Sequence, residues 1–404
     1  MNKTNRWIYA IAGVIVLLFA GLIYAWSVLS SPIAAEFTSW SKGALSLTFT
    51  LAMSFFCIGG LVAGLVADKV RERYIFIVSA VLFLIGFELV SMISSIGMLY
   101  LGFGVLAGLG AGCSYNAVMG SVTKWFPDKK GLISGILLMG FGIGAFIIGK
   151  VYAGLLGSFG WREEFKALGI IVFAVIFIGA FIVRKPTAEE QKAYAVEDKK
   201  SEKSTSEDFT TIEMVSKVSF WLYFVYAILL SAAALALIAQ ASGIVTETAP
   251  ALAAGSIATI VGLISIFNGI GRVIFGGLYD KLGQKKTMLL NCGLFLVSVL
   301  INIVAINSVS LPLVVIGFIF FGLSYGGVTP TNSAYIMDFY GVKNYPVNFS
   351  IINLNLLLAS FGGTLAGMIY DMQGTYLSIF MIMIGAIVLA TICTLLIKRP
   401  AKGK

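Results

Sequence analysis

Long apolar segments, separated by short polar stretches, recur along almost the whole chain. A transmembrane helix needs about 20 mostly apolar residues, and twelve segments meet that length. They cover residues 7–29, 44–67, 74–97, 99–123, 131–155, 164–183, 219–245, 253–279, 286–306, 311–337, 346–370 and 374–397. The pattern predicts an all-α integral membrane protein with twelve transmembrane helices.

Residues 184–217 interrupt this pattern with seven basic and eight acidic side chains. A stretch of this composition is typical of a solvated linker that is partly disordered. It separates six apolar segments from six. The sequence therefore predicts an N-terminal six-helix bundle (1–183), a linker (184–217) and a C-terminal six-helix bundle (218–404).

Short motifs recur at matching places in the two halves. GLVADK (64–69) corresponds to GGLYDK (276–281), and GCSY (112–115) corresponds to GLSY (322–325). Because six spans is an even number, the two halves point the same way across the membrane. This is the parallel-repeat arrangement, in which a substrate site lies near the midplane between the halves.

The basic residues predict the orientation of the protein. If the N-terminus is cytoplasmic, 23 of the 28 Lys and Arg residues fall on the cytoplasmic side, as the positive-inside rule requires. We therefore expect a multi-pass protein of the cytoplasmic (inner) membrane with both termini inside. The net charge of +9 then follows from topology and does not indicate a nucleic-acid partner.

The rest of the composition argues against an enzyme or a metalloprotein. The chain is 59% hydrophobic, contains no histidine, and carries its four cysteines singly in different apolar segments. No paired acids, HExxH motif or nucleophile–base set lies at membrane depth. We expect no catalytic residue, no metal and no cofactor.

Arg272 lies inside an apolar segment, in SIFNGIGRVIFGG (265–277). A guanidinium stays charged in proteins, and a charge at the bilayer centre costs about 2.5 kcal/mol or more. Arg272 precedes Asp280 by eight residues, or about 12 Å of helix, which places it near the midplane. We expect it to bind a carboxylate substrate; the alternative is a structural bond to backbone carbonyls. Asn268, one turn earlier, is a second candidate donor or a helix–helix hydrogen-bonding residue.

Several motifs resemble those of a known family. GLVADKVRERY and GGLYDKLGQKK resemble the cytoplasmic loop signature of the major facilitator superfamily. WFPDKKGLISG (125–135), GLIYAWSVLSSP (21–32) and FNGIGR (267–272) resemble the oxalate/formate antiporter family, a relative of the monocarboxylate transporters. The resemblance covers nearly the whole chain except the linker and the C-terminal tail. It implies the major facilitator fold and transport by alternating access.

The resemblance also implies which helices line the cavity. In the superfamily fold these are the first, second, fourth and fifth helices of each half. Tyr24, Tyr115 and Tyr325 are then candidate wall residues whose hydroxyls can orient a small anion. Phe141 and Phe321 are candidates for setting the size of the cavity. The alternative for each of these aromatic residues is helix packing.

One position departs from the family pattern. The oxalate exchanger that names the family pairs its helix-8 arginine with a helix-11 lysine. Counting through NYPVNFSIINLNLLLASFGG (344–363) puts Asn355 or Ile352 at that position. A single fixed charge favours a monocarboxylate over a dicarboxylate, because an unpaired charge in a low-dielectric cavity is costly. Lys150 is either an accessory cation that would restore dicarboxylate binding or an interfacial lysine.

Charged clusters at helix ends accompany the two loop signatures. The first contains Asp68, Lys69 and Arg73, and the second contains Asp280 and Lys281. We expect these clusters to latch helix ends in one conformation. The alternative is that they are ordinary interfacial charges.

The predicted function is therefore secondary active transport of a small monocarboxylate such as formate, lactate or pyruvate. Proton symport and carboxylate exchange both remain open, with Glu88 either a proton carrier or a hydrogen-bonded carboxyl between helices. The alternatives are an oxalate or other dicarboxylate/formate antiporter and a drug/proton antiporter, the latter disfavoured by a positive central charge. A short tail disfavours a transporter-like sensor. Expected partners are the carboxylate, a proton in the case of symport, and the lipid bilayer, with the protein acting as a monomer.

Overall fold

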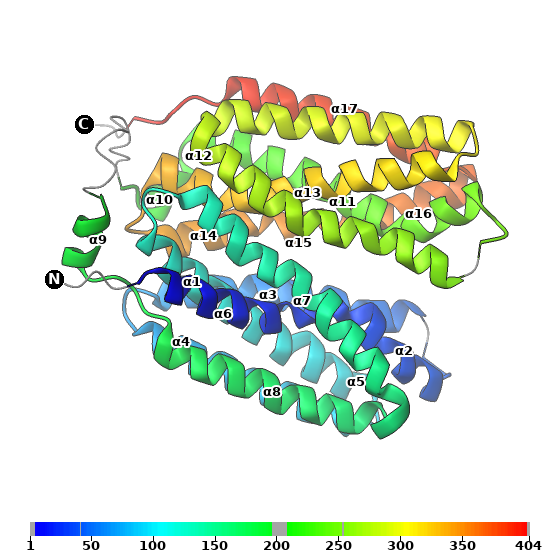
Figure 1. The fold of residues 1–404 in the computed structure, drawn as a ribbon, viewed down its shortest axis with the longest axis horizontal. Helices are drawn as coiled ribbons and strands as arrows, with labels where there is room; N and C mark the ends of the chain where they lie inside the picture. Colours follow the sequence, from blue (N-terminus) through cyan, green and yellow to red (C-terminus); the bar gives the residue numbers. More distant parts are fainter. Residues whose placement is uncertain (1–4, 41, 196–207, 253, 402–404) are drawn as a thin grey trace. The chain divides into compact units, whose positions relative to one another are not determined.

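The computed structural model describes residues 5–40, 42–195, 208–252 and 254–401, and all regular elements in these ranges are helices (Figure 1). The all-α prediction is thus confirmed. In the described chain, 11 helical runs are long and apolar enough to cross a membrane. One of them, Thr259–Asn307, joins two helices at Gly283, whose φ of 77° is not helical. Counting these two separately gives the twelve predicted spans.

Internal contacts divide the chain into two compact units. The first unit comprises Met1–Asp128, Gly140–Ser204 and Tyr345–Ile351. The second comprises Lys129–Met139, Thr205–Asn344 and Ile352–Lys404. Two helices, α7 (Lys130–Phe159) and α14 (Tyr345–Asn353), therefore contribute residues to both units. The predicted domain boundaries at 183/184 and 217/218 make no allowance for such shared helices.

The first unit is built from helices that pack closely through glycine. Besides most of α7, its elements are α1 (Trp7–Ala20), the 3₁₀ segment η1 (Gly21–Ala25), α2 (Trp26–Glu36), α3 (Lys42–Val66), α4 (Glu72–Ser91), α5 (Ile96–Leu99), the π-helical η2 (Tyr100–Ala107), α6 (Gly108–Val122), the 3₁₀ turn η3 (Thr123–Trp125), α8 (Trp161–Ile182) and α9 (Ala188–Ala195). A Cβ atom on Gly112 of α6 would lie 2.0 Å from the carbonyl oxygen of Phe56 in α3. Small residues of this kind let membrane helices approach one another where lipid gives no hydrophobic drive.

The second unit contains one helix that is buried over a continuous stretch of its length. Its elements, besides the parts of α7 and α14, are α10 (Thr211–Val215), α11 (Val218–Thr248), α12 (Ala254–Asn307), α13 (Leu311–Tyr340), α15 (Asn355–Ala359), α16 (Phe361–Gln373) and α17 (Leu377–Leu396). α13 packs along α12 (Figure 1), and every residue from Ser324 to Met337 is buried. Polar side chains on this stretch of α13 are therefore held inside the protein.

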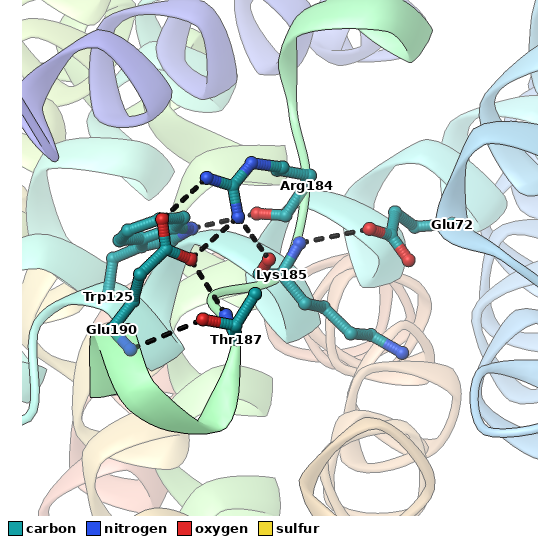
Figure 2. Close-up of polar contacts among 6 residues, drawn as sticks. All are labelled: Glu72, Trp125, Arg184, Lys185, Thr187 and Glu190. Carbon is teal, nitrogen blue, oxygen red and sulfur yellow. Dashed lines mark hydrogen bonds and ion pairs between the residues drawn. The ribbon is translucent and has the colours of Figure 1, made fainter. Parts of the chain in front are cut away.

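The start of the linker is docked on the first unit (Figure 2). The Arg184 guanidinium donates to both carboxylate oxygens of Glu190, at 2.7 and 2.8 Å, and lies over the Trp125 ring. The Trp125 indole N–H donates to the Arg184 carbonyl at 2.8 Å, and the Lys185 amide donates to Glu72 at 2.9 Å. These contacts fix the chain where it leaves α8.

A capping box begins the short helix α9. The Thr187 amide donates to Glu190 Oε2 at 2.8 Å, and the Glu190 amide donates to Thr187 Oγ1 at 3.2 Å. The pair satisfies two of the amides that a helix N-terminus leaves without partners. The middle of the linker, where we predicted disorder, falls on residues 196–207 and lies outside the described residues.

The end of the linker is docked on the second unit. The Phe209 amide donates to the Tyr340 carbonyl at 3.0 Å. The Asp208 carboxylate accepts the amides of Val342 and Lys343, each at 2.9 Å. The described parts of the linker are therefore ordered at both of its ends.

We predict that Glu190→Gln loosens α9. Hydrogen bonding to Arg184 lowers the pKa of Glu190 from 4.5 to about 2, so the charged pair stabilises the docked helix fully above pH 4.5 and is lost as the pH falls toward 2. Hydrogen exchange should show several-fold faster exchange of the α9 amides in Glu190→Gln at pH 7, and unchanged protection in the wild type between pH 7 and 5. Glu189→Gln, at an exposed neighbouring position, is the control. Equal exchange in the two variants would contradict the prediction.

Candidate substrate-binding site

Arg272 is buried in the first helix of α12, with 9% of its surface exposed. Its Nε–H donates to Oδ1 of Asn268 at 2.9 Å, and Nη1 donates to the carbonyl of Leu138 in α7. None of the ion pairs formed by the described residues involves Arg272. The charge is therefore held by two neutral acceptors.

The contacts of Arg272 leave part of its guanidinium available. A guanidinium has five N–H groups, and these two hydrogen bonds use one on Nε and one on Nη1. The remaining three are all on the terminal nitrogens, the edge that grips a carboxylate with two parallel bonds. The structural alternative, a bond to a backbone carbonyl, is thus present without saturating the group.

Asn268 orients Arg272. Its Oδ1 accepts from Nε, and both predicted roles, donor to the substrate and helix–helix hydrogen bond, stay predictions. This contact closes the side edge of the guanidinium and leaves the terminal edge for a ligand. The Nδ2 group of Asn268 remains the atom that can donate.

Glycines bring three helices close to Arg272. A Cβ on Gly271 would lie 2.2 Å from the carbonyl oxygen of Leu323 in α13. A Cβ on Gly135 of α7 would lie 2.2 Å from the carbonyl oxygen of Arg272. Gly131 and Gly276 meet in the same way, each with 2.2 Å between its Cβ position and the other's carbonyl oxygen. No larger residue fits these crossings without moving a backbone, so they set how near α7 and α13 come to the arginine.

Of the two aromatic residues predicted in the C-terminal half, one lies near Arg272. Tyr325 of α13 is 8% exposed and interacts electrostatically with the guanidinium. Phe321 is fully buried, and its ring centroid lies 5.3 Å from that of Phe295 in the second helix of α12. The contact of Phe321 is one of helix packing.

The three aromatic residues predicted in the N-terminal half form one cluster in the first unit. The ring centroid of Phe141 in α7 lies 5.5 Å from that of Tyr24 in η1 and 5.1 Å from that of Tyr115 in α6. Tyr115 also stacks on Phe349 of α14, at 5.7 Å. Phe141 therefore joins the two tyrosines.

The predicted helix-11 position is engaged within the second unit. Asn355 is fully buried; its Nδ2 donates to the Ile352 carbonyl at 2.5 Å, and its Oδ1 accepts from Ser231 of α11 at 3.2 Å. An amide here brings no charge to the second unit. Whether Asn355 contacts substrate stays a prediction.

The two predicted accessory charges, Glu88 and Lys150, belong to the first unit. Glu88 is three residues from the end of α4, at the end opposite the loop signature, and interacts electrostatically with Lys166 of α8. Lys150 lies in α7, and its side chain is outside the described part of the structure. Their accessory roles stay predictions.

The second loop signature caps a helix. The Asp280 carboxylate accepts the Gly131 amide on Oδ1 and the Leu132 amide on Oδ2, both at 2.8 Å. These amides begin α7, where a negative charge is also favoured by the helix dipole. A backbone partner of this kind leaves no mark in the sequence apart from the acidic residue itself.

The other predicted latch residues are on the surface. Asp68, Lys69 and Lys281 are exposed, and the Arg73 guanidinium lies 3.7 Å from the ring centroid of Phe181 in α8. In this structure the two signatures thus make different contacts, although their sequences repeat.

Sequence reasoning missed three hydrogen bonds of the shared helices. Ser134 of α7 shares a 2.7 Å hydrogen bond with Ser333 of α13 in the second unit. Asn116 of α6 donates to the Pro346 carbonyl of α14 at 2.9 Å and to Ser350 Oγ at 2.6 Å in the first unit. The only available signal was a polar residue within an apolar segment.

Comparison with known proteins identifies the family. The sequence profile described as "Major Facilitator Superfamily" matches residues 10–364. The chain belongs to the major facilitator superfamily. It is therefore a multi-pass membrane transporter, and the family resemblance of its loop motifs is confirmed.

Named relatives of this superfamily member include anion carriers. It is 28% identical to the oxalate:formate antiporter of Oxalobacter formigenes over 345 residues, 84% of this chain and 80% of that protein. It is 26% identical to the uncharacterized MFS-type transporter YhjX of Escherichia coli (strain K12), covering 89% and 86% of the two chains. Monocarboxylate transporter 12 of Mus musculus is 38% identical over 108 residues, 27% of this chain and 22% of that one.

Solved structures share the major facilitator fold. The proton:xylose symporter XylE matches with a TM-score of 0.71 at 14% identity, covering 97% of this chain and 95% of that one. FucP in its outward conformation matches with a TM-score of 0.67 at 16% identity, covering 97% and 99%. At these identities the likeness shows the fold alone, and it confirms the predicted fold class.

We predict that the α7–α12 crossing does not tolerate a methyl group at Gly276. Its Cβ would lie 2.2 Å from a backbone oxygen, whereas a Cβ on the adjacent Gly277 would meet only Leu132 Cδ1 at 3.7 Å. Gly276→Ala should cost about 1–3 kcal/mol of stability and reduce transport. Gly277→Ala should stay within about 0.5 kcal/mol. Thermal unfolding in detergent compares the two; equal melting temperatures would show that the crossing is not tight.

Proposed function

We propose that this major facilitator transporter moves a small monocarboxylate, of the formate, lactate or pyruvate type, and binds it through Arg272. The observation that carries the proposal is a buried, permanently charged guanidinium. Its two hydrogen bonds to the protein leave three N–H groups. None of the ion pairs among the described residues involves it. Tyr325 near the guanidinium is a candidate for a second hydrogen bond to the anion.

A single positive charge favours one carboxylate. The neutral amide of Asn355 supplies no second cation, so a dicarboxylate would bring one negative charge that this site does not neutralise. The likeness to the oxalate:formate antiporter keeps a dicarboxylate/formate antiporter as the alternative, distinguished by whether oxalate binds. A drug/proton antiporter is disfavoured because a positive site repels cationic drugs.

We infer that the mode of transport is carboxylate exchange. The two groups that contact Arg272, the Asn268 amide and the Leu138 carbonyl, do not take up a proton at physiological pH. An empty carrier would have to move the bare charge through a dry state, whereas a bound carboxylate neutralises it. The return step therefore requires a second anion.

We propose alternating access with the loop signatures on the cytoplasmic side, as the distribution of basic residues favours. The cap of Asp280 on the first turn of α7 then acts as a latch at that side. Asp68, exposed here, is proposed to serve the corresponding role in another conformation of the carrier. The protein is proposed to act as a monomer in the cytoplasmic membrane.

Arg272→Gln should reduce formate uptake into proteoliposomes at least tenfold, because a neutral amide cannot compensate the charge of the anion. Thermal-shift measurements with formate, lactate, pyruvate and oxalate should show stabilisation of the wild type by a monocarboxylate and no stabilisation of the variant. Arg162→Gln removes an arginine that pairs with Glu36 and is the matched control. High-affinity uptake by Arg272→Gln would refute the assignment of the site.

Preloaded vesicles separate the two modes of transport. Uptake of labelled formate should require unlabelled carboxylate inside and should not follow an imposed pH gradient in empty vesicles. Uptake driven by the pH gradient alone would instead establish proton symport.

A further inference from the structure

We propose that the transported carboxylate and the Leu138 carbonyl compete for Arg272, so that substrate binding detaches the first turns of α7 from the second unit. This inference rests on the proposed function, because it assigns Arg272 to the substrate. It adds a second role: the same guanidinium holds a helix segment in place when the site is empty.

The segment concerned is Lys129–Met139, here termed the α7 leading segment. Its contacts place it in the second unit, whereas the rest of α7, from Gly140 onward, belongs to the first. Within α7, residues up to Met139 belong to the second unit and residues from Gly140 belong to the first. Its leading segment is therefore the part whose attachment can change while the remainder stays with its own bundle.

Among the polar contacts of the described residues, three attach the α7 leading segment to the second unit. Asp280 accepts the amides of its first turn, at Gly131 and Leu132. One turn further along, Ser134 shares a hydrogen bond with Ser333. At the far end of the segment, Arg272 donates to the Leu138 carbonyl.

Only the attachment through Arg272 is made by a group that also serves the proposed substrate site. Because Asn268 closes the Nε side of the guanidinium, a carboxylate must approach the terminal edge that contains Nη1. A carboxylate is a stronger acceptor than a peptide carbonyl. The negatively charged oxygens of the carboxylate also repel the nearby oxygen of Leu138. In the proposed mechanism the guanidinium rotates to pair both terminal nitrogens with the anion, and the Nη1 bond to the Leu138 carbonyl is given up in that rotation.

Loss of the contact leaves no stranded polar group. Leu138 lies inside α7, where its carbonyl belongs to the helical hydrogen-bond ladder, and the guanidinium is paired with the substrate. A ligand shifts a conformational equilibrium only through a difference in affinity between the two states. The competition at Nη1 supplies that difference, and loss of one charged hydrogen bond corresponds to about a tenfold change in the equilibrium.

The attachment can be measured as a distance within the second unit. The native cysteines are first replaced by alanine, and spin labels are then attached at Lys129→Cys and Lys285→Cys, which are both exposed positions. The first label reports on the leading segment and the second on α12. In the parent chain, formate should increase the population with the longer label separation. Arg272→Gln should show that population increased about tenfold without formate, with no further change on adding formate.

A second variant tests the competition with Arg272 intact. Ser333→Ala removes the neighbouring attachment, so it should raise the longer-distance population and, by reciprocity, tighten formate binding several-fold. Unchanged formate affinity in Ser333→Ala, despite a raised longer-distance population, would overturn the competition.

The inference and the proposed function fail in different ways. If Arg272→Gln loses formate binding but keeps the parent's distance distribution without formate, the arginine binds substrate and does not hold the segment, and the inference is overturned. If formate fails to bind the parent chain while Arg272→Gln still shifts the distances, the proposed function is overturned and the attachment stands.

Discussion

A permanent charge inside a bundle of apolar helices is the constraint on which the site depends. Arg272 cannot lose its proton, so the protein must satisfy the group wherever the helix carries it. The fold does so with an amide oxygen one turn away and a carbonyl from another helix. These acceptors make burial tolerable without supplying the opposite charge. The same compromise that allows the arginine to be buried leaves it able to attract an anion.

Close helix crossings are what make this compromise possible. The Leu138 carbonyl reaches the guanidinium only because α7 and α12 cross at Gly131, Gly135 and Gly276, with no side chain between their backbones. The same crossing presents the first amides of α7 to Asp280. The contacts of Arg272 and the helix cap of Asp280 therefore lie along the same helix crossing. A change in the separation of α7 from α12 changes both together.

Much of the fold follows from the sequence because the bilayer imposes a simple length rule. Apolar length predicted all twelve spans, and an i, i+4 spacing placed Asn268 and Arg272 on the same helix face. The breaks within spans were harder: the first apolar segment is divided by η1 (Gly21–Ala25), and the eleventh consists of α14, α15 and α16. Such interruptions depend on tertiary packing, which hydropathy does not record.

The contacts of the candidate site were less predictable because its decisive partners are backbone atoms. Every residue has a backbone carbonyl, and every residue except proline has a backbone N–H, so no residue type signals the Leu138 carbonyl or the Gly131 amide. The role of Phe321 in setting the size of the cavity stays a prediction, and the structure shows that its ring packs on Phe295. A helix has several buried faces in a bundle, and composition does not say which of them meets the substrate.

The two halves repeat in sequence without repeating in contact. Asp280 caps α7, whereas Asp68 is exposed and the amides of Val342 and Lys343, just before α14, are bound by Asp208 from the linker. A carrier that alternates between two conformations is expected to use equivalent motifs at different times, so one structure shows one of them engaged. Placing the charged site beside the engaged motif gives substrate chemistry direct access to the helix that the motif holds. Under the proposed function, that proximity, rather than the strength of any single bond, links binding to movement.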